Sequence, residues 1–576
     1  MSKVYGIDLG TTYSAISFLN DNGLPEVIEN FADGKAILAS AVYFPEGGDP
    51  VIGEAAKNQL EIEPDRVVQF VKRQIGKPEA QSYDYNGVQY DPITVSALIL
   101  KRMVEYAKEQ DHDVKNVVIT CPAYFGNAER DATRQAGKIA GLNVLNIVNE
   151  PTAAAFNYLS REFKESKKIM VYDLGGGTFD ISLFDFSVDD SGITTIDLID
   201  SGGDDRLGGA DWDARLFNHI SNLYIDETGI ERDDLDNDGE LKQKIRSIVE
   251  TTKMSLTGLK QRAFTVSHNG DNTRLEVMRE KFEEITNDLV DRTTTYMHDL
   301  LTKTSLTPDN IDIVLLVGGS TKMPMIKEAI DKVFPGKVRF EDPDQAVAKG
   351  AAIAAAVEFN ERIRDYIEKK TNPDNVEESV FDENIEDIIE VSDIPDSIED
   401  VKNLLVNVPQ TFSEGSKVID RLSRTFGTAV IVGDYLAIVN MLYIGDESPS
   451  EITEDSFCTS RDNQPLLQFE IFESLAGRDV TVIKHMGLDG TEIEKDHLLQ
   501  VKKIGVLELK LSGNDPAGSP IEFTIRARTG GLDVAGRNPR TNETFTASIE
   551  SEFTKSAQEM NEAIKHIAAT STRGDF

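Results

Sequence analysis

The chain has 576 residues and a formal net charge of −40 at pH 7, from 100 Asp and Glu against 60 Lys and Arg. A chain of this length is too long for one hydrophobic core, so we expect two or three domains. The strongly acidic surface repels nucleic acid and anionic membranes, which excludes both as expected partners. The two cysteines, Cys121 and Cys458, lie outside any CxxC spacing, so neither a disulfide framework nor a zinc site is predicted.

The amino terminus passes from one lysine directly into a strand-like run, without the charged, apolar and small-residue regions of a signal peptide. Further along, no apolar stretch reaches the roughly eighteen residues that a membrane span needs. We therefore expect a cytoplasmic protein.

Residues 1–360 alternate short apolar strands with stretches of helical periodicity, which predicts an α/β architecture. Two segments in this region look alike, GIDLGTTYSAISF from Gly6 and YDLGGGTFDISLF from Tyr172. Each opens with a strand, an aspartate and a glycine turn. The sequence thus predicts a duplicated nucleotide-binding fold with a cleft between its two lobes.

The composition changes after residue 360. Residues 361–416 read as an acidic linker, helical in part, since fifteen carboxylates face four Lys or Arg between 361 and 400. Residues 417–550 form short alternating runs separated by Gly, Asn, Asp and Pro, which predicts an all-β sandwich of antiparallel strands. Residues 551–576 suffice for one short helix or tail.

The two glycine turns suit phosphate chemistry. Glycine lets backbone N–H groups approach a phosphate closely, threonine offers a hydroxyl, and aspartate positions Mg²⁺ or its waters. One such turn alone is equally consistent with a hairpin that binds nothing. Two turns of the same kind, residues 8–12 and 173–178, favour a pair of facing hairpins that clasp one polyphosphate. Because no GxxxxGK[ST] motif occurs and no GxGxxG opens a helix, P-loop and dinucleotide folds lack support.

Seven segments in the first 350 or so residues also carry a family resemblance: GIDLGTTYS, VKRQIG, CPAYFGNAERDATRQAGKIAGLNV, NEPTAAAFNY, DLGGGTFDIS, LLVGGSTKMPMI and DPDQAVAKGAA. In this order they resemble the ATPase domain of the seventy-kilodalton heat-shock chaperone family, the DnaK-like proteins. The resemblance implies an actin-like ATPase domain that hydrolyses ATP slowly to ADP and phosphate, with Mg²⁺ and K⁺ as candidate ions.

The resemblance also implies roles for single residues. It gives Lys72 the positioning of the attacking water, with Glu150, Asp180 and Thr178 as further catalytic groups. Asp8 and Asp173 are expected to hold Mg²⁺, mostly through water. Phosphoryl transfer to water depends on positioning and charge neutralisation, so these groups suffice without a covalent nucleophile. The residues expected to contact the nucleotide are Gly10, Thr11, Thr12, Tyr13, Gly175, Gly176, Gly177, Gly202, Gly203, Glu250, Lys253, Thr257, Gly318, Gly319, Ser320, Lys322 and Asp344.

Two groups of residues, one at the nucleotide site and one after a predicted strand, have an alternative interpretation. Glu250, Lys253 and Thr257 match the family's E-x-x-K-x-x-x-S helix, whose spacing puts three polar groups on one face. Without the resemblance, that face reads as ordinary solvated surface. Pro122 and Arg130 match the family's proline switch and its partner arginine, which connect nucleotide state to domain docking. Structurally, Pro122 would equally well end a strand.

The sequence departs from the family at several positions. Lys322 stands where many relatives have an arginine that stacks on adenine, which predicts weaker nucleotide binding. Arg206 and Ala210 replace the usual His and Glu. Asn146 replaces an arginine that meets the J-domain co-chaperone, so stimulation by a standard J-protein is in doubt. The closest match to the family's short apolar linker, KVIDRLS at 417–423, follows an acidic segment, which predicts altered coupling between the domains.

The β-region resembles the family's peptide-binding sandwich more loosely. The residues that fall where the family lines its apolar peptide groove are Val430, Ile431, Phe457, Ser460, Leu467 and Phe469. Each of them is also readable as sandwich core. The family's helical lid does not fit into the roughly twenty-five residues after 550, so fast peptide exchange is expected.

Three functions follow, in decreasing order of support. The first is an ATP-regulated chaperone-like protein, in which the state of the cleft biases binding of extended apolar peptide to the β-domain. Its expected partners are unfolded polypeptide, a J-domain co-chaperone and a nucleotide exchange factor. The second is a nucleotide-gated module dedicated to one protein client. The third, a small-molecule kinase of the actin-like superfamily, would need its own substrate pocket and catalytic aspartate.

Overall fold

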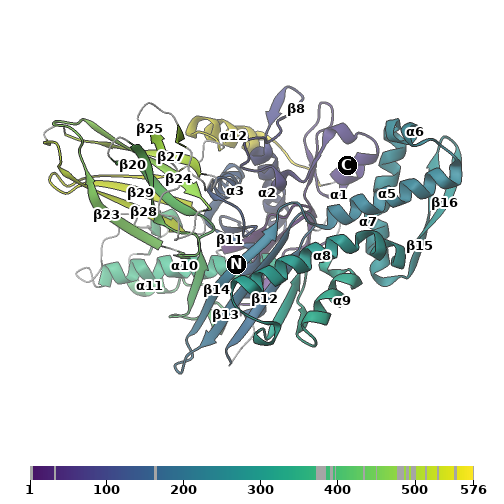
Figure 1. Cartoon of the computed structure of the whole chain (residues 1–576), viewed down its shortest axis with the longest axis horizontal. Coiled ribbons are helices and arrows are strands. Elements are labelled where there is room, and N and C mark those ends of the chain that lie inside the picture. The colour runs from purple at the N-terminus through teal and green to yellow at the C-terminus, as the bar shows by residue number, and fades with distance from the viewer. Residues whose placement is uncertain are drawn as a thin grey trace.

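The structure is a computed structural model of the chain, shown in Figure 1. It describes residues 4–30, 34–160, 165–371, 385–389, 394–395, 397–432, 435–448, 450–475, 485–487, 492–493, 501–512, 515–528, 531–549 and 554–574. An α/β part occupies the middle and right of Figure 1, and a β-rich part lies at its left. We call the described residues from 4 to 160 the first lobe and those from 165 to 345 the second lobe.

Each lobe is built on one mixed sheet. The first sheet has the order β11-β10-β1-β2-β3 and the second the order β18-β17-β12-β13-β14. The bounds are β1 (Val4–Asp8), β2 (Tyr13–Leu19), β3 (Pro25–Val27), β10 (Asn116–Cys121), β11 (Asn143–Asn149), β12 (Lys167–Leu174), β13 (Phe179–Val188), β14 (Thr194–Asp204), β17 (Ile313–Val317) and β18 (Val338–Phe340). In both sheets an antiparallel hairpin, β1–β2 or β12–β13, has two parallel strands beside its first strand. This shared order is what the predicted duplication requires.

Smaller elements extend the lobes. They are β4 (Leu38–Ala39), β5 (Ala41–Tyr43), β6 (Val51–Ile52), α1 (Glu54–Asn58), β7 (Val67–Gln69), the short 3-10 helix η3 (Val71–Arg73), β8 (Tyr83–Tyr85), β9 (Val88–Tyr90), α6 (Arg232–Asn237), β15 (Gln261–His268) and β16 (Asp271–Met278). The longer helices are α2 (Pro92–Lys108), α3 (Asn127–Ile139), α4 (Glu150–Leu159), α5 (Gly209–Thr228), α7 (Gly239–Gly258), α8 (Arg279–Lys303), α9 (Pro324–Val333) and α10 (Ala346–Thr371). Among the described residues, no helix combines the length and apolar character that crossing a membrane demands.

Helices α4 and α10 pack against each other at unusually short range. A Cβ on Gly350 of α10 would lie 1.6 Å from the carbonyl oxygen of Ala153 in α4. A Cβ on Gly6 of β1 would lie 2.0 Å from the backbone nitrogen of Ala352. Glycine is therefore required at both positions, because any side chain there would push the helices and the first sheet apart. This packing holds α10 against both α4 and strand β1 of the first sheet.

The predicted linker match lies on the second sheet. Strand β19 (Lys417–Arg421) pairs in parallel with β14. Arg421 donates to Asp197 at 2.6 Å and to the carbonyl oxygen of Leu198 at 3.0 Å. The outer edge of β19 pairs with β22 (Glu447–Ser448). The start of the β-rich part is thus hydrogen-bonded to the second lobe.

Two antiparallel sheets make up the β-rich part, in the orders β26-β25-β21-β20-β24-β27 and β23-β28-β29-β30. Their bounds are β20 (Thr425–Val432), β21 (Tyr435–Leu442), β23 (Ser450–Cys458), β24 (Leu466–Ser474), β25 (His485–Gly487), β26 (Glu492–Ile493), β27 (Val501–Lys510), β28 (Pro520–Arg528), β29 (Gly531–Asn538) and β30 (Glu543–Ser548). The inner faces share one apolar core, since a Cβ on Gly536 of one sheet would contact Leu509 of the other. In chain order the short helix α11 (Ile398–Lys402) comes between the lobes and these sheets, and it contacts α10.

Helix α12 (Ala557–Ala569) packs on the first lobe, beside α2 and α3 (Figure 1). Its apolar face inserts Ala563 and Ile567 into the core of that lobe. Lys101 of α2 donates to the carbonyl oxygens of Ile567 and Thr570, at 2.6 and 2.5 Å, which stabilises the end of the helix. Beyond the helix, Arg573 exchanges backbone hydrogen bonds with Pro50 and Ile52.

We predict that Ile567→Ala detaches α12 locally. The fully buried side chain leaves a cavity when truncated, which costs about 2 kcal/mol or more. Amides of residues 557–569 should then exchange hydrogen faster by at least about tenfold, measured by hydrogen–deuterium exchange with mass spectrometry. Lys565→Ala, on the exposed face of the same helix, serves as the matched control. Equal protection in both variants would contradict the docked position.

Candidate functional site

The two predicted phosphate turns meet each other. The β1–β2 turn spans residues 9–12 and the β12–β13 turn spans residues 175–178. A Cβ on Gly176 would lie 1.7 Å from the Thr12 hydroxyl oxygen, and one on Gly177 would lie 2.4 Å from a methyl carbon of Thr11. Only glycine permits this approach. The Thr12 hydroxyl is buried and has no hydrogen-bond partner within the described part of the chain, so it is available to a polar ligand.

Three buried carboxylates and the half-buried carboxylate of Asp8 lie near one buried ammonium group beside these turns. Asp8 ends β1, Asp173 lies in β12, Asp180 in β13, and Glu150 is the first residue of α4. Lys72, in η3 of the first lobe, forms an ion pair with Glu150. The fold therefore brings together five residues that lie up to 172 positions apart in the sequence. They are the residues to which the family resemblance gives roles in catalysis and metal binding.

The site holds more negative than positive charge when its carboxylates are ionised. Burial, reinforced by the charge of Glu150, raises the pKa of Asp8 to about 7 and that of Asp180 to about 8. The same causes raise the pKa of Asp173 well above its ordinary value. Burial works against the charge of Lys72, but Glu150 and Asp8 outweigh it and raise the pKa of this lysine. Lys72 accordingly stays protonated.

These residues fit a hydrated divalent cation. The excess of buried carboxylates is the charge environment that Mg²⁺ neutralises. Across the described residues, no three Asp, Glu, His or Cys side chains come close enough to ligate a metal ion directly. Mg²⁺ keeps several of its waters in protein sites, so Asp8 and Asp173 are the residues that would hold it, through water.

Glu250 of α7 is bound across the cleft. The hydroxyl group of Tyr13 donates to Glu250 at 3.2 Å, and Lys57 of α1 forms an ion pair with the same carboxylate. Lys57 also donates to the Tyr13 hydroxyl at 2.9 Å. Tyr13 and Glu250 were both predicted from sequence, whereas Lys57 was not, because it lies in no motif. The three side chains tie the first lobe to the second.

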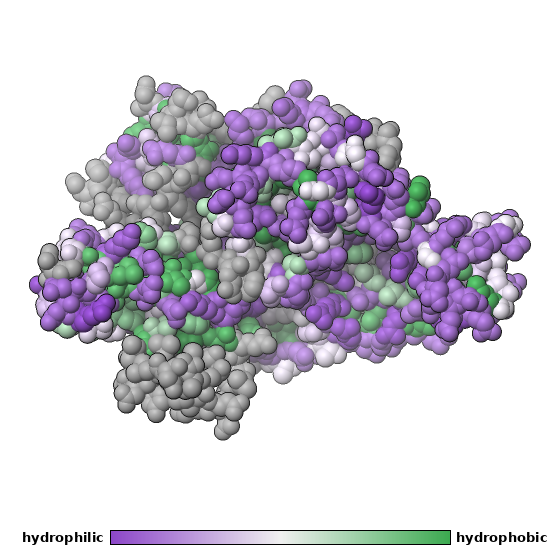
Figure 2. All heavy atoms as spheres, turned by 90° about the horizontal axis from the view of Figure 1, so that it is seen from above, coloured by the Kyte–Doolittle hydropathy of each residue, from purple (hydrophilic) through white to green (hydrophobic). Residues whose placement is uncertain are grey.

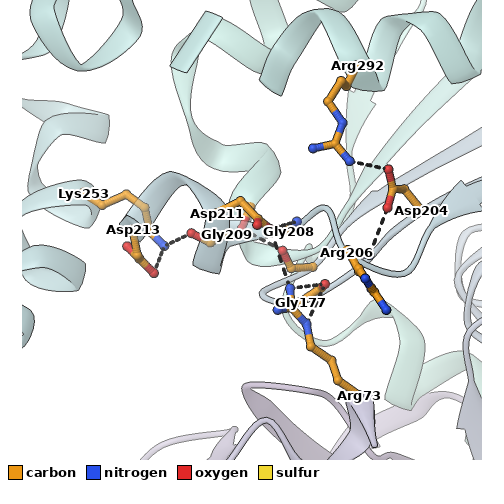
Figure 3. Close-up of polar contacts among 12 residues, drawn as sticks. Arg73, Gly177, Asp204, Arg206, Gly208, Gly209, Asp211, Asp213, Lys253 and Arg292 are labelled. Carbon is orange, nitrogen blue, oxygen red and sulfur yellow. Dashed lines mark hydrogen bonds and ion pairs between the residues drawn. The ribbon is translucent and has the colours of Figure 1, made fainter. Parts of the chain in front are cut away.

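The remaining predicted nucleotide contacts lie in the second lobe. Lys253 donates to the carbonyl oxygen of Gly209 at 3.0 Å and to Asp213 at 2.7 Å (Figure 3). Ser320 donates to the carbonyl oxygen of Gly175 at 2.9 Å, and Lys322 forms an ion pair with Asp344.

The predicted glycines, together with Thr178 and Thr257, lie in the turns and strands around the cleft and at the end of α7. Gly202 and Gly203 lie in β14 opposite Ile181 and Asp180. Gly318 has φ +82°, a left-handed conformation that favours glycine, and Gly319 follows it. Gly10 is in the first turn, where its N–H donates to Ser14, and Thr178 closes the second turn by accepting from the N–H of Gly175. Thr257 is half-buried on the last turn of α7.

The predicted switch residues connect the first lobe to β19. Pro122 directly follows β10 and accepts a backbone hydrogen bond from Phe125. Buried Arg130 donates to the carbonyl oxygen of Phe125 at 2.9 Å and to Asn149 at 2.6 Å. Asn149 in turn donates to Asp420 of β19 at 3.0 Å. A continuous polar chain therefore runs from the Pro122 turn to the docked linker strand.

The predicted groove residues have varied positions in the β-rich part. Phe457 and Phe469 pack against Phe523, with Phe469 stacked on Phe523 at a ring distance of 4.5 Å. Phe469 is buried between the two sheets, which is the core position weighed as its alternative. Leu467 packs partly buried against the same core. Ser460 is exposed and bound to Gln464, Val430 is half-buried, and the side chain of Ile431 lies outside the described residues.

Comparison with known proteins gives one family. The model of the family described as Hsp70 protein matches residues 4–83 and 79–394. The chain is 40% identical over 364 residues to the chaperone protein DnaK of Thermotoga neapolitana, covering 62% of this chain and 59% of that protein. It is 40% identical over 364 residues to DnaK of Thermosipho melanesiensis, with the same coverage, and 38% identical over 363 residues to DnaK of Mycoplasmopsis agalactiae, covering 62% and 58%. The match thus spans under two thirds of these relatives.

We predict that Asp180→Asn stabilises the nucleotide-free, magnesium-free protein increasingly as the pH rises. The pKa of Asp180 is raised to about 8 in the folded chain, above about 3.9 when unfolded, so ionisation costs stability between those values. Asparagine avoids this cost. The difference in Tm, variant minus wild type, should grow by at least about 2 °C from about pH 5.5 to about pH 8.5, measured by calorimetry in EDTA.

Asp226→Asn, an exposed change on α5, is the matched control and should give the same difference at every pH. A difference that stays flat for Asp180→Asn as well would contradict the raised pKa.

Proposed function

Since the chain belongs to the Hsp70 family, we propose that it hydrolyses ATP to ADP and phosphate and uses the nucleotide state of its cleft to regulate polypeptide binding. The observation that carries this proposal is the meeting of two glycine turns beside one buried, protonated lysine and its carboxylates. We assign the nucleotide part to residues 1–360, the acidic linker to 361–416, the β-sandwich to 417–550 and the tail to 551–576.

Lys72 is the residue we assign to orienting the attacking water. Its ammonium group stays charged because Glu150 and Asp8 raise its pKa against the effect of burial. Glu150 holds that ammonium in place, and Asp180 is itself fixed by the N–H of Ala123 at 3.1 Å. A bound Mg²⁺ would neutralise charge on the phosphates. The residues that would hold it are Asp8 and Asp173.

The phosphate turns are suited to hold the polyphosphate by their backbone. Their glycines expose N–H groups where a Cβ would collide with the facing turn. Thr11, Thr12 and Thr178 add hydroxyl groups at the same place. On the α7 side, Glu250 and Lys253 are proposed to meet the ribose and base. In the described structure they bind Tyr13, Lys57 and Asp213.

Coupling between the cleft and the β-rich part is supported by the contacts of β19. Asn149 and Glu150 are neighbours at the junction of β11 and α4. Glu150 binds Lys72, whereas Asn149 binds both Arg130 and Asp420. We propose that a change of nucleotide at the cleft moves this junction and thereby alters the docking of β19.

The β-rich part is the proposed polypeptide site. In Figure 2, apolar surface gathers at the left end of the molecule, where this part lies. Its exposed apolar side chains include Val439, Ile452, Leu475, Val506 and Phe545. Extended apolar polypeptide is the proposed ligand. A J-domain co-chaperone and an exchange factor are further proposed partners. At the position of the family's J-domain arginine, Asn146 instead donates to Glu358 at 3.2 Å.

We predict that Lys72→Ala slows single-turnover ATP hydrolysis by at least about a hundredfold, because it removes a preorganised charged donor. Hydrolysis is measured by chemical quench with excess protein over labelled ATP. Lys332→Ala, an exposed lysine of α9, is the matched control and should leave the rate unchanged. Equal rates in both variants would remove Lys72 from the catalytic group.

The same assay separates the two leading functions. An apolar extended peptide should accelerate the wild-type rate if the protein is a chaperone with coupled domains. If hydrolysis depends on Lys72 but ignores unrelated peptides, a module dedicated to one client becomes the better account.

We further predict that Asp420→Ala weakens coupling more than hydrolysis. Asp420 is buried in β19 and accepts from Asn149, so its loss frees the linker strand from the first lobe. Peptide stimulation should fall by about fivefold or more, while hydrolysis without peptide changes little. Glu414→Ala, an exposed carboxylate before β19, is the control. Unchanged stimulation in Asp420→Ala would contradict the proposed route.

A further inference from the structure

A cavity of about 320 Å³ lies between the lobes, beside the phosphate turns. It is lined by Arg73, Gln74, Lys77, Glu79 and Ala80 from the first lobe and by Asp205 and Arg206 from the second. None of these residues belongs to the turns or to the buried carboxylate group. The volume is many times what one water needs, so a small hydrated ligand fits.

Arg73 forms the wall between this cavity and the second phosphate turn. Its guanidinium group donates to the carbonyl oxygen of Gly177 through two nitrogens, Nε at 3.1 Å. A Cβ on Gly177 would lie 2.4 Å from Thr11 and 3.0 Å from Nε of Arg73. Gly177 thus contacts the first turn and Arg73 at once. The second phosphate turn is therefore in direct contact with a residue that lines the cavity, as Figure 3 shows for Arg73 and Gly177.

The cavity carries an excess of positive charge. Arg73, Lys77 and Arg206 contribute three cations, and Glu79 and Asp205 contribute two carboxylates, which leaves +1 on the lining. This balance contrasts with the net charge of −40 on the whole chain. An anion near the cleft is therefore attracted to this cavity and repelled by most of the remaining surface.

Among the described residues, Arg206 is the lining cation whose side chain has no hydrogen-bond or ion-pair partner. Its backbone N–H donates to Asp204, which also binds Arg292 (Figure 3). The exposed guanidinium of Arg206 makes no hydrogen bond or ion pair with any described residue. Lys77, by contrast, already donates to Asp205 at 3.1 Å, and Arg73 lies 3.6 Å from Asp211. A planar guanidinium with unused N–H groups suits the oxygens of a phosphate.

We propose that this cavity is a transient site for inorganic phosphate leaving the cleft. The inference rests on the proposed ATP hydrolysis, in which water attacks the terminal phosphorus and its bond to the bridging oxygen breaks. ADP and phosphate result, and the cavity takes no covalent part. Phosphate passes Gly177, exchanges hydrogen bonds with Arg73 and Lys77, and is held by Arg206. The carboxylates of Glu79 and Asp205 keep this binding weak, so the ion moves on.

Arg206→Gln tests the site, because glutamine keeps a polar side chain but removes the charge. In single turnovers, hydrolysis is followed by chemical quench and free phosphate by a fluorescent phosphate-binding sensor. The ratio of release rate to hydrolysis rate should fall about tenfold in the variant, as expected for the loss of a charged hydrogen bond. Lys77→Gln should lower the ratio in the same direction. Release that keeps pace with hydrolysis as in the wild type would overturn the exit role.

A binding measurement makes the phosphate site independent of hydrolysis. Inorganic phosphate is titrated into the ADP-bound full chain and followed by the width of its ³¹P resonance. Broadening by the wild type that is lost in Arg206→Gln supports the site, and equal broadening in both overturns it. Arg232→Gln, an arginine of α6 bound to Asn222, is the matched control and should behave as the wild type.

The two measurements also distinguish the source of the phosphate. If the wild type hydrolyses no ATP, the proposed function and the exit role both fail. Arg206-dependent broadening would then establish a site filled by phosphate from solution.

Discussion

The buried ion pair between Lys72 and Glu150 is the interaction around which the charged groups of the candidate site are arranged. An almost fully buried ammonium group is stabilised by a neighbouring carboxylate, and removing one partner of such a pair typically costs about 3–5 kcal/mol. Lys72 comes from η3, Glu150 from the start of α4, and the nearby aspartates from the hairpins of both sheets. The pair itself lies within the first lobe, and Asp173 and Asp180 of the second lobe lie close enough for its charges to shift their pKa values. The close packing of α4 on α10 holds α4 in place, and with it Glu150 at the start of that helix.

The same junction carries the route to the β-rich part. Adjacent residues on a strand end or helix start point in different directions, and here Glu150 turns to the carboxylate group while Asn149 turns to Arg130 and Asp420. A shift of the junction therefore changes hydrogen bonds at both ends. Strand β19 pairs with β14 in this structure, and the proposed coupling requires a second arrangement in which β19 is released, because coupling between distant sites needs an element with two discrete states.

The sequence predicts the centre of the site better than its surroundings. Repeated Asp-Gly-Thr turns after strands led directly to facing hairpins, because glycine requirements are local and visible in the sequence. Lys57 was missed because a lone lysine in a short helix has no spacing signal, although its ion pair with Glu250 joins the lobes. Alternation in the β-region predicted which faces are apolar. It does not distinguish a face that meets another sheet, as at Phe469, from one that meets a ligand.

The position at which α12 docks also could not be predicted from the sequence. The amphipathic spacing of residues 557–569 predicts a helix with one apolar face, but every apolar surface of the molecule is a candidate partner for it. What selects the first lobe is the combination of Ile567 in its core with Lys101 beneath the last carbonyl groups. Those contacts join residues more than 460 positions apart, which no local pattern encodes.

The second phosphate turn lies between a group of carboxylates and a cavity with an excess of cations. Asp8, Asp173 and Asp180 lie on the side of the carboxylate group, where a free phosphate anion is repelled once the charges that held it are rearranged. Arg73 and Arg206 lie on the other side, in the cavity with an excess of cations. Gly177 lies between the carboxylates and these arginines. Because Gly177 has no side chain, both Thr11 and Arg73 can approach its backbone. In the proposed exit route, a phosphate ion at this turn is therefore attracted electrostatically towards Arg73 and Arg206.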